Sequence, residues 1–448
     1  MHNSRIAYAK CVSFVEGAKR LYFGGILGAS MSSLARLLWE RGYEVAGCDR
    51  RWDSPEGDAL RRAGILVEDE MIPHLLEGDL VVYTLALGED APLIQKTGEM
   101  GLPCISRAQL LGVVMGMYGE GVAVSGTHGK STTVGMLSAI LTESGLSPTI
   151  AGGAPLDLDG ASYRKGGDSL FLTEGCEYKD SFLSLSPSLG IVTNVEYDHP
   201  DYFPSLEAVK GSFLDFMARC KQVCVNISCR ALAEICPKRA YTYGFSPNAY
   251  LRGQVTEGGL LVYEGGVPLG EVTLKVRGSY QRENALSAIA GARCLGVPFP
   301  TIQKGLEGFL GIGRRLEKRG SFCGAEVYLD YAHHPTQIKN AVDALSPYGE
   351  VYCIYQPHTY TRTAALWGEF ASALRLPDAC ILIDIYPARE APMEGVSSKA
   401  LAKAAGVAYA PTLREAKEWV RGRLKKGNLL LLMGAGDIAD GISLFLEG

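Results

Sequence analysis

The stretch from residue 122 to residue 144 restricts the possible folds more than any other part of the chain. An apolar strand candidate at 122–125 runs directly into the turn GTHGKST at 126–132, and a helical pattern continues through 131–144. Backbone N–H groups at the start of a helix, together with the helix dipole, attract phosphate oxygens, and Lys130 adds a positive charge. Ser131 offers a hydroxyl oxygen of the kind that binds Mg2+ in such loops. The order of strand, glycine turn and helix therefore predicts a phosphate loop in an α/β domain.

Strand and helix candidates alternate along the chain in three groups. The first group has strand candidates at 21–25, 43–46, 65–68, 80–84 and 103–105 and a helix at 31–41. The second group opens at 122 and adds strands at 169–173, 189–193 and 222–225, hairpins within 250–276 and a helix at 281–294. The third group has strands at 325–331, 351–355, 379–384 and 429–433, with helices from Pro335 and at 363–375. Alternation of this kind predicts α/β domains with mostly parallel sheets.

Length and composition agree with a multidomain enzyme. The chain has 448 residues, of which 47% are hydrophobic, and a net charge of -5, which argues against nucleic acid as a partner. The first 20 residues lack the apolar core of a signal peptide, and no apolar stretch approaches the length of a membrane span. Twelve cysteines without paired spacing indicate reduced thiols. We therefore expect a cytoplasmic protein without membrane insertion.

Eight motifs spread over nearly the whole chain resemble those of the Mur ligase family. They are GTHGKSTT from Gly126, EGCEYKDSF from Glu174, TNVEYDHPDYF from Thr193, GRRLE from Gly313, DYAHHPTQIK from Asp330, QPHTYTRT from Gln356, DIYPAREAP from Asp384 and MGAGDI from Met433. Together these motifs are far more specific than any one of them.

The resemblance implies a three-domain α/β enzyme. A Rossmann-like domain at 1–118 would bind a UDP-sugar, a central P-loop ATPase domain at 119–312 would bind ATP, and a Rossmann-like domain at 313–448 would bind an amino acid. In this family ATP, with Mg2+, phosphorylates the substrate carboxylate, and an amine attacks the acyl phosphate. The implied substrates are UDP-N-acetylmuramate and L-alanine, joined in peptidoglycan precursor synthesis by a monomer or weak homodimer. This chemistry is physically reasonable, because the transferring phosphoryl group needs positive charge from lysine and metal.

The motif positions imply roles for individual residues. The implied catalytic residues are Lys130, Glu174 and His199, and the implied metal ligands are Ser131, Glu174 and His199. The implied ATP-binding residues are Gly126, Thr127, His128, Gly129, Lys130, Ser131, Thr132, Asn284, Arg315 and Asp330. The implied amino-acid pocket contains Tyr331, His333, His358 and Arg362, and the implied UDP-sugar site contains Gly25, Gly28, Met31, Ser32, Asp49 and Thr84. From the sequence pattern alone, Glu174 could equally be a solvent-exposed carboxylate at a strand end, and His199 a loop histidine with no role in metal binding.

The first phosphate turn differs from the family pattern GxGGxGMS. Residues 25–32 read GILGASMS, so Leu27 and Ser30 replace two glycines that permit positive φ and close approach to a pyrophosphate. The family motif His-Asn-x-x-Asn reads YQREN at 280–284, which keeps Asn284 and offers Tyr280 for stacking on a base. The changed turn leaves open a Mur-type ligase that acts on a different carboxylate donor.

Two further hypotheses belong to other functional classes. The 25–32 turn, followed about 20 residues later by Asp49, is an arrangement found in oxidoreductases that bind NAD. An NAD-dependent oxidoreductase would not explain why the chain has a phosphate loop at 126–132. A nucleotide-gated binding protein that hydrolyses ATP without ligation is the non-catalytic alternative, and the combined loop, metal and amine-side residues argue against it.

Overall fold

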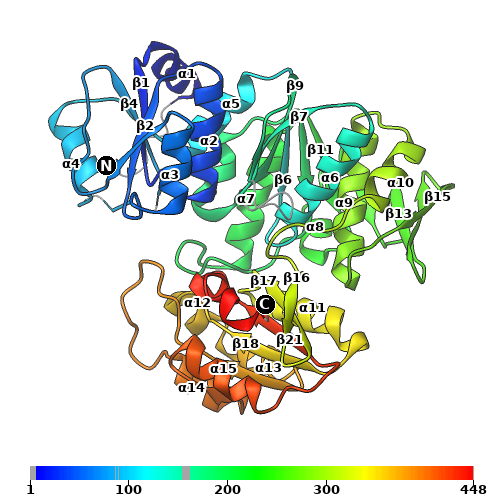
Figure 1. Ribbon diagram of the computed structural model, residues 1–448. Coiled ribbons are helices and arrows are strands. Elements are labelled where there is room, and N and C mark those ends of the chain that lie inside the picture. Colours follow the sequence, from blue (N-terminus) through cyan, green and yellow to red (C-terminus); the bar gives the residue numbers. More distant parts are fainter. Residues whose placement is uncertain (1–6, 86, 89, 154–161, 447–448) are drawn as a thin grey trace.

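Three α/β domains follow one another along the chain in the computed structural model, which describes residues 7–85, 87–88, 90–153 and 162–446. Their central sheets have five, ten and six strands, which confirms the predicted fold class. Figure 1 shows the N-terminal domain beside the middle domain, with the C-terminal domain lying beneath them in this view. None of the helices in the described part of the chain combines the length and the apolar character that a membrane crossing requires.

The N-terminal sheet is parallel, with strand order β3-β2-β1-β4-β5. Its strands are β1 (Arg20–Gly24), β2 (Val45–Asp49), β3 (Leu66–Asp69), β4 (Asp79–Tyr83) and β5 (Cys104–Ser106). Its helices are α1 (Tyr8–Gly17), α2 (Ala29–Glu40), α3 (Pro55–Arg62), α4 (Pro92–Glu99) and α5 (Arg107–Gly116). The strand order reverses between β1 and β4, and such a switch point opens a crevice at the carboxyl ends of the strands. The turn between β1 and α2 lies at this point.

The middle sheet is parallel at its centre and antiparallel at both edges, in the order β15-β14-β13-β12-β11-β10-β6-β9-β7-β8. Its strands are β6 (Glu120–Ser125), β7 (Pro148–Ala151), β8 (Tyr163–Arg164), β9 (Gly167–Gly175), β10 (Leu189–Val192), β11 (Gln222–Asn226), β12 (Tyr241–Gly244), β13 (Leu251–Val255), β14 (Gly259–Glu264) and β15 (Val267–Thr273). Its helices are α6 (Lys130–Glu143), η1 (Tyr178–Ser184), α7 (Leu206–Arg219), α8 (Arg230–Glu234), α9 (Ser279–Cys294) and α10 (Phe299–Glu307). The antiparallel strands β13, β14 and β15 confirm the hairpins predicted within 250–276.

The C-terminal sheet has the order β16-β17-β21-β18-β19-β20 and is parallel except for the β16–β17 hairpin. Its strands are β16 (Glu317–Phe322), β17 (Ala325–Asp330), β18 (Val351–Tyr355), β19 (Ala379–Leu382), β20 (Ala408–Tyr409) and β21 (Leu429–Met433). Its helices are α11 (Pro335–Leu345), η2 (Ser346–Tyr348), α12 (Tyr360–Ala365), α13 (Trp367–Ala373), α14 (Ser398–Ala405), α15 (Leu413–Arg421), η3 (Asp437–Ala439) and η4 (Ile442–Phe445).

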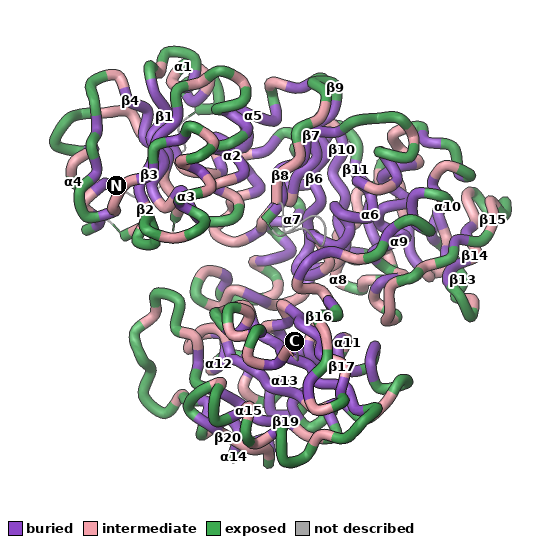
Figure 2. The backbone as a smooth tube through the Cα atoms, in the orientation of Figure 1, coloured by how far each residue is buried: buried purple, intermediate pink, exposed green. Residues whose placement is uncertain are grey.

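The central strands are buried on both faces because helices cover both sides of the sheets. All five residues of β1 and all five of β21 are buried, and Figure 2 shows buried segments concentrated in the sheets. A parallel sheet covered on both faces needs continuously apolar strands, which explains the sequence LLLLM of β21. The sheets are therefore rigid supports for the loops at their carboxyl ends.

The helix predicted at 363–375 is wrong as a single element. The structure has two helices, α12 and α13, separated at Leu366, whose φ of -111° and ψ of 28° are not helical. The apolar spacing continues across this break, and periodicity therefore does not detect it. The strands predicted at 351–355 and 429–433 match β18 and β21 residue for residue.

A buried ion pair joins β1 to β4 and allows a test of the N-terminal fold. Arg20 donates to both carboxylate oxygens of Asp79, at 3.0 and 2.8 Å. Asp79→Ala should lower the free energy of unfolding by about 3–5 kcal/mol, because the arginine charge would stay buried without the carboxylate that neutralises it. Urea unfolding measures the loss, and Glu418→Ala, which removes the exposed partner of Arg421, is the control with an expected loss below about 1 kcal/mol. Equal losses in the two variants would contradict the prediction.

Candidate active site

Two positions of the phosphate loop between β6 and α6 require glycine. Gly126 and Gly129 have φ values of 143° and 82°, which other residues rarely adopt. A Cβ atom on Gly126 would lie 2.0 Å from Thr193 Oγ1, and one on Gly129 would lie 2.3 Å from Asn284 Oδ1. The loop therefore packs tightly against the end of β10 and against α9.

Lys130, at the start of α6, is paired with an acid that the sequence analysis missed. Its Nζ lies 2.9 Å from Glu177 Oε2 and also contacts the carbonyl oxygen of Gly126. Burial alone would raise the pKa of Glu177, but Lys130 and His199 outweigh burial and lower this pKa below its ordinary value. Glu177 thus neutralises the lysine where phosphate oxygens are expected. The only sequence hint was its position three residues after Glu174 in the same motif.

Ser131 and Glu174 lie close enough to share one cation. Ser131 Oγ donates to Glu174 Oε1 at 3.0 Å, and the N–H of Gly153 donates to the same oxygen at 3.0 Å. Neighbouring oxygen ligands of an octahedral Mg2+ ion lie about 2.9 Å apart, so these two oxygens fit that ion. The third predicted ligand, His199, lies against Glu177 instead, with its Nε2 3.7 Å from Glu177 Oε1, and Glu177 pairs with Lys130. The φ of 56° at His199 is uncommon outside glycine and shows that its surroundings hold the loop.

A buried ion pair between the middle and C-terminal domains lies next to His199. Arg362 Nε donates to Asp198 Oδ1 at 2.8 Å, and only 7% and 4% of the two side chains are exposed. Burial alone would raise the pKa of Asp198, whereas the Arg362 guanidinium holds it well below its usual range. Asp198 Oδ1 also accepts from the N–H of His199 at 2.7 Å. Asp198 was not predicted from the sequence, and it connects α12 to the loop that carries His199.

The predicted amino-acid residues gather around Arg362. Arg362 Nη1 lies 3.2 Å from His358 Nδ1, and the ring centres of His333 and His358 are 6.2 Å apart. Tyr331 is one step further away, with its ring 5.3 Å from that of His333. Burial, reinforced by Arg362, lowers the pKa of His358 to about 4 and that of His333 well below its usual value. The two imidazole rings are therefore neutral, and the charges beside them are the guanidinium of Arg362 with its partner Asp198, while Arg314 and Arg315 lie over the ring of Tyr331. A guanidinium can bind the carboxylate of an amino acid.

The predicted nucleotide residues outside the loop lie at the junction of the middle and C-terminal domains. Burial raises the pKa of Tyr280, with a further contribution from the nearby carboxylate of Asp330 and an opposing one from Arg315. The two oxygens of Asp330 accept from the backbone N–H groups of Leu316 and Ala332, each at 2.8 Å. Asp330 therefore fixes the linker after Arg315 to the end of β17, beside the position proposed for the base.

The turn between β1 and α2 is occupied by contacts from its own neighbours. Gly25 has a φ of 75°, and the N–H of Leu27 donates to Asp49 Oδ2 at 3.0 Å. Ser30 Oγ accepts from Arg107 Nη1 at 2.9 Å. Arg107 was not predicted, since it lies far along the sequence at the start of α5. It brings a positive charge to the turn where the family has glycine.

The remaining predicted UDP-sugar residues surround this turn. Gly28 is the N-cap of α2, Met31 is buried in that helix, and Ser32 Oγ donates to the carbonyl oxygen of Ala29 at 3.0 Å. A Cβ atom on Gly25 would lie 3.2 Å from Thr84 Cγ2, so Thr84 borders the turn directly. The structure thus brings the predicted residues together at the switch point of the N-terminal sheet.

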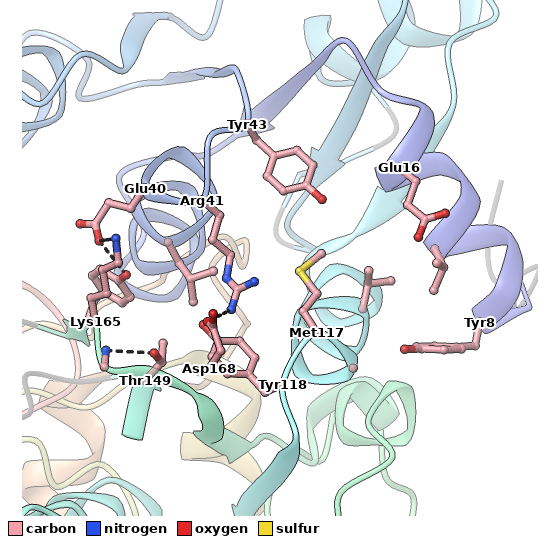
Figure 3. A pocket seen from close by; sticks show the side chains of 16 residues that line it. Tyr8, Glu16, Glu40, Arg41, Tyr43, Met117, Tyr118, Thr149, Lys165 and Asp168 are labelled. Atoms are coloured by element: carbon pink, nitrogen blue, oxygen red, sulfur yellow. Dashed lines mark hydrogen bonds and ion pairs between the residues drawn. The ribbon is translucent and has the colours of Figure 1, made fainter. Parts of the chain in front are cut away.

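A cavity of about 650 Å3 between the N-terminal and middle domains lies elsewhere. Figure 3 shows Arg41 reaching Asp168 and Lys165 reaching Glu40 in this cavity. The guanidinium of Arg41 also lies 4.4 Å from the ring centre of Tyr118. These charges are paired with one another, and none of the predicted site residues is among the described residues that line the cavity. We therefore interpret it as packing at the boundary between two domains.

Three matches to known families cover most of the chain. Residues 20–118 match the Mur ligase family, catalytic domain, residues 124–292 match the Mur ligase middle domain, and residues 314–436 match the Mur ligase, glutamate ligase domain. The chain belongs to the Mur ligase family. As a Mur ligase it is an ATP-dependent enzyme that forms an amide bond, which excludes the NAD-dependent oxidoreductase and the non-catalytic binding protein.

Individual Mur ligases resemble the chain from end to end. The UDP-N-acetylmuramate–L-alanine ligase of Acetivibrio thermocellus is 36% identical over 96% of both chains. That of Solidesulfovibrio magneticus is 37% identical over 96% of this chain and 98% of its own. The structure of the UDP-N-acetylmuramate–alanine ligase from Thermotoga maritima has a TM-score of 0.80 at 25% identity, covering 95% of this chain and 98% of that one. A murein peptide ligase from Psychrobacter arcticus shares the fold, with a TM-score of 0.74 at 23% identity over 94% and 97%.

Replacing Glu177 by glutamine should change how ATP stabilises this Mur ligase. Without nucleotide the variant would keep Lys130 buried with no opposite charge, so its free energy of unfolding should fall by about 3 kcal/mol. Bound phosphate would restore the opposite charge, and ATP should therefore raise the melting temperature more in Glu177→Gln than in the wild type. Thermal unfolding with and without ATP measures both effects. The control is Glu143→Gln, which changes an exposed carboxylate on α6, the helix that carries Lys130. If ATP raised the melting temperature equally in the variant and the wild type, Glu177 would not occupy the place of phosphate beside Lys130.

Asp198→Asn should lower the free energy of unfolding by an amount that depends on pH. The pKa of Asp198 in the folded protein lies below its unfolded value, so the stability it contributes is present above about pH 4 and lost as the pH falls through the folded value. The variant should lose about 3–5 kcal/mol at pH 7, and this difference should shrink below about pH 4. Urea unfolding between pH 3 and 7 measures it, with the exposed Asp215→Asn as control. A loss independent of pH would contradict the pairing.

Proposed function

We propose that this Mur ligase joins the carboxylate of UDP-N-acetylmuramate to L-alanine, using ATP, in cytoplasmic peptidoglycan precursor synthesis. Relatives that match it over almost their whole length carry this activity in their names. The observation that carries the proposal is a continuous series of contacts from Lys130 through Glu177, His199 and Asp198 to Arg362. It joins the phosphate loop and the amine-side guanidinium in one site, as attack of an amine on an acyl phosphate requires.

Each segment of the chain would hold one substrate. We assign the UDP-sugar to residues 1–118, ATP to residues 119–312 and alanine to residues 313–448, in line with the three separate sheets. All the side chains assigned to the reaction come from one chain, so a monomer or weak homodimer suffices. Closure of the C-terminal domain over the middle domain would shield the acyl phosphate from water.

Each site residue would have one task in the reaction. When ATP binds, Lys130 would leave its ion pair with Glu177 and bind the terminal phosphates. Mg2+, when held by Ser131 and Glu174 with His199 nearby, supplies positive charge that offsets the charge of the transferring phosphoryl group. Arg362 would bind the alanine carboxylate, which leaves the amine free to reach the acyl group.

The turn after β1 favours a second candidate, in which the same chemistry acts on a different carboxylate donor. Leu27 and Ser30 place side chains where the family pattern has glycine, and the N–H of Leu27 already donates to Asp49. This N–H is therefore not directed to a diphosphate. The guanidinium of Arg107 beside Ser30 supports the original donor instead, because it can hold two phosphate oxygens at once. Activity with each donor separates the two candidates.

Phosphate release from ATP and Mg2+ tests the proposed function. With UDP-N-acetylmuramate present, release should depend on L-alanine and should fall at least about 100-fold in Lys130→Ala, because the transferring group loses its charged partner. The exposed Lys238→Ala is the matched control and should keep wild-type rates. If alanine-dependent phosphate release were seen only with another acid, that acid would be the carboxylate donor in place of UDP-N-acetylmuramate. Release that ignores every amine would contradict the ligase assignment.

A further inference from the structure

His128 in the phosphate loop contacts the C-terminal domain. Its ring packs on that of His334, the N-cap of α11, at 4.7 Å between centres. Glu196, from the loop after β10, lies between them, with one carboxylate oxygen 3.5 Å from His128 Nε2 and 3.9 Å from His334 Nδ1. His128 is 9% exposed, and its Nε2 has no hydrogen-bond partner. Two imidazoles and a carboxylate at this spacing are a typical set of metal ligands, so a cation site is one explanation.

The orientation of Gln337 determines where the proton of His128 lies. Gln337 Oε1 accepts from the backbone N–H groups of His333 at 2.9 Å and His334 at 3.2 Å. The other end of its amide is therefore the NH2 group, and this group lies 3.0 Å from His128 Nδ1. Nδ1 must accept this hydrogen bond, so the ring proton of His128 is on Nε2 and points towards Glu196.

The same hydrogen bonds exclude the cation site. A metal on His128 Nε2 would move the proton to Nδ1, where it would face the NH2 group of Gln337. His334 Nδ1 is also engaged, since it accepts the N–H of Thr336 at 3.3 Å. Burial and the neighbouring His128 lower the pKa of His334 to about 4, so this ring is neutral, with its proton on Nε2 near the carbonyl oxygen of Tyr197. Neither ring therefore offers a free lone pair towards Glu196.

The backbone of His128 is held by its own domain, independently of the ring. Its N–H donates to Asn194 Oδ1 at 2.8 Å, and its carbonyl oxygen accepts from Thr193 Oγ1 at 2.7 Å. The shape of the phosphate loop thus does not require the C-terminal domain. The direction of the His128 ring does require the C-terminal domain, because Gln337, which contacts the ring, belongs to α11. The same helix also contacts the loop after β10, because Thr336 Oγ1 donates to Glu196 Oε2 at 2.7 Å.

We propose that His128 and Gln337 form a latch between the phosphate loop and the C-terminal domain. When the C-terminal domain docks, Gln337 selects one tautomer of His128, and the Nε2–H group then faces Glu196, which Thr336 holds from the same helix. Through their side chains both act as positioning residues: they align the amino-acid pocket with the phosphate loop. This inference rests on the proposed ligase reaction for its kinetic consequence only.

The tautomer can be observed directly in the full-length protein labelled with 15N-histidine. The chain has seven histidines, and the signal missing from His128→Asn identifies His128. The wild type should show an accepting Nδ1 and a protonated Nε2, and Gln337→Met should lose this preference. A protonated Nδ1 in the wild type, or a His128 signal that shifts on adding Zn2+, would overturn the latch in favour of a metal site. This readout needs no activity, so it is independent of the proposed function.

Kinetics test the positioning role. Gln337→Met should lower kcat at least about three- to tenfold, which is the loss expected for the hydrogen bond to His128 alone, and leave the KM for ATP within about twofold. In a His128→Asn background the same substitution should lower kcat less, because only the hydrogen bonds from the His333 and His334 N–H groups to Gln337 are then left to lose. The exposed Lys339→Met on the same helix is the matched control. An equal loss in both backgrounds, or a change confined to the KM for ATP, would overturn the positioning role even if the tautomer is as expected.

Discussion

The active site depends on a charge pair that can be buried only where two domains meet. Arg362 belongs to the C-terminal domain and Asp198 to the middle domain, and less than a tenth of either side chain is exposed. A buried guanidinium or carboxylate without its partner is strongly destabilising, so docking of the domains and burial of the pair must occur together. Because Asp198 adjoins His199 and Arg362 adjoins His358, the same event brings the predicted metal ligand and the predicted amino-acid pocket together. In the proposed reaction, docking would couple substrate alignment to the exclusion of water.

The phosphate loop is built for a highly charged ligand and remains balanced without one. Positive φ values at Gly126 and Gly129 and close contacts with Thr193 and Asn284 hold its backbone in one shape. Glu177 supplies the negative charge that Lys130 needs while buried. A preformed site of this kind does not reorganise when the phosphoryl group moves, and this is the main source of electrostatic catalysis. A rigid middle domain would therefore complement the proposed closure of the C-terminal domain.

Much of the site could be predicted because its key residues lie in short motifs at strand ends. Ser131, Glu174 and His199 were predicted as ligands of one cation; the oxygens of the first two lie 3.0 Å apart, whereas His199 lies against Glu177. Glu177, Asp198 and Arg107 were missed, because each acts through a partner that is distant in sequence. The break between α12 and α13 was missed for a related reason, since apolar spacing describes which face is buried and not where a helix ends.

The sequence by itself determined the three-domain α/β class, the phosphate loop and the family, because glycine turns, apolar strands and motif spacing are local properties of the chain. Only the tertiary structure decided which buried charges are paired and which tautomer His128 adopts. The partner of Arg362 is 164 residues away and that of His128 is 209 residues away. Pairs at such separation form because two rigid sheets present their carboxyl-end loops to each other, and burial then makes an unpaired polar group too costly to tolerate.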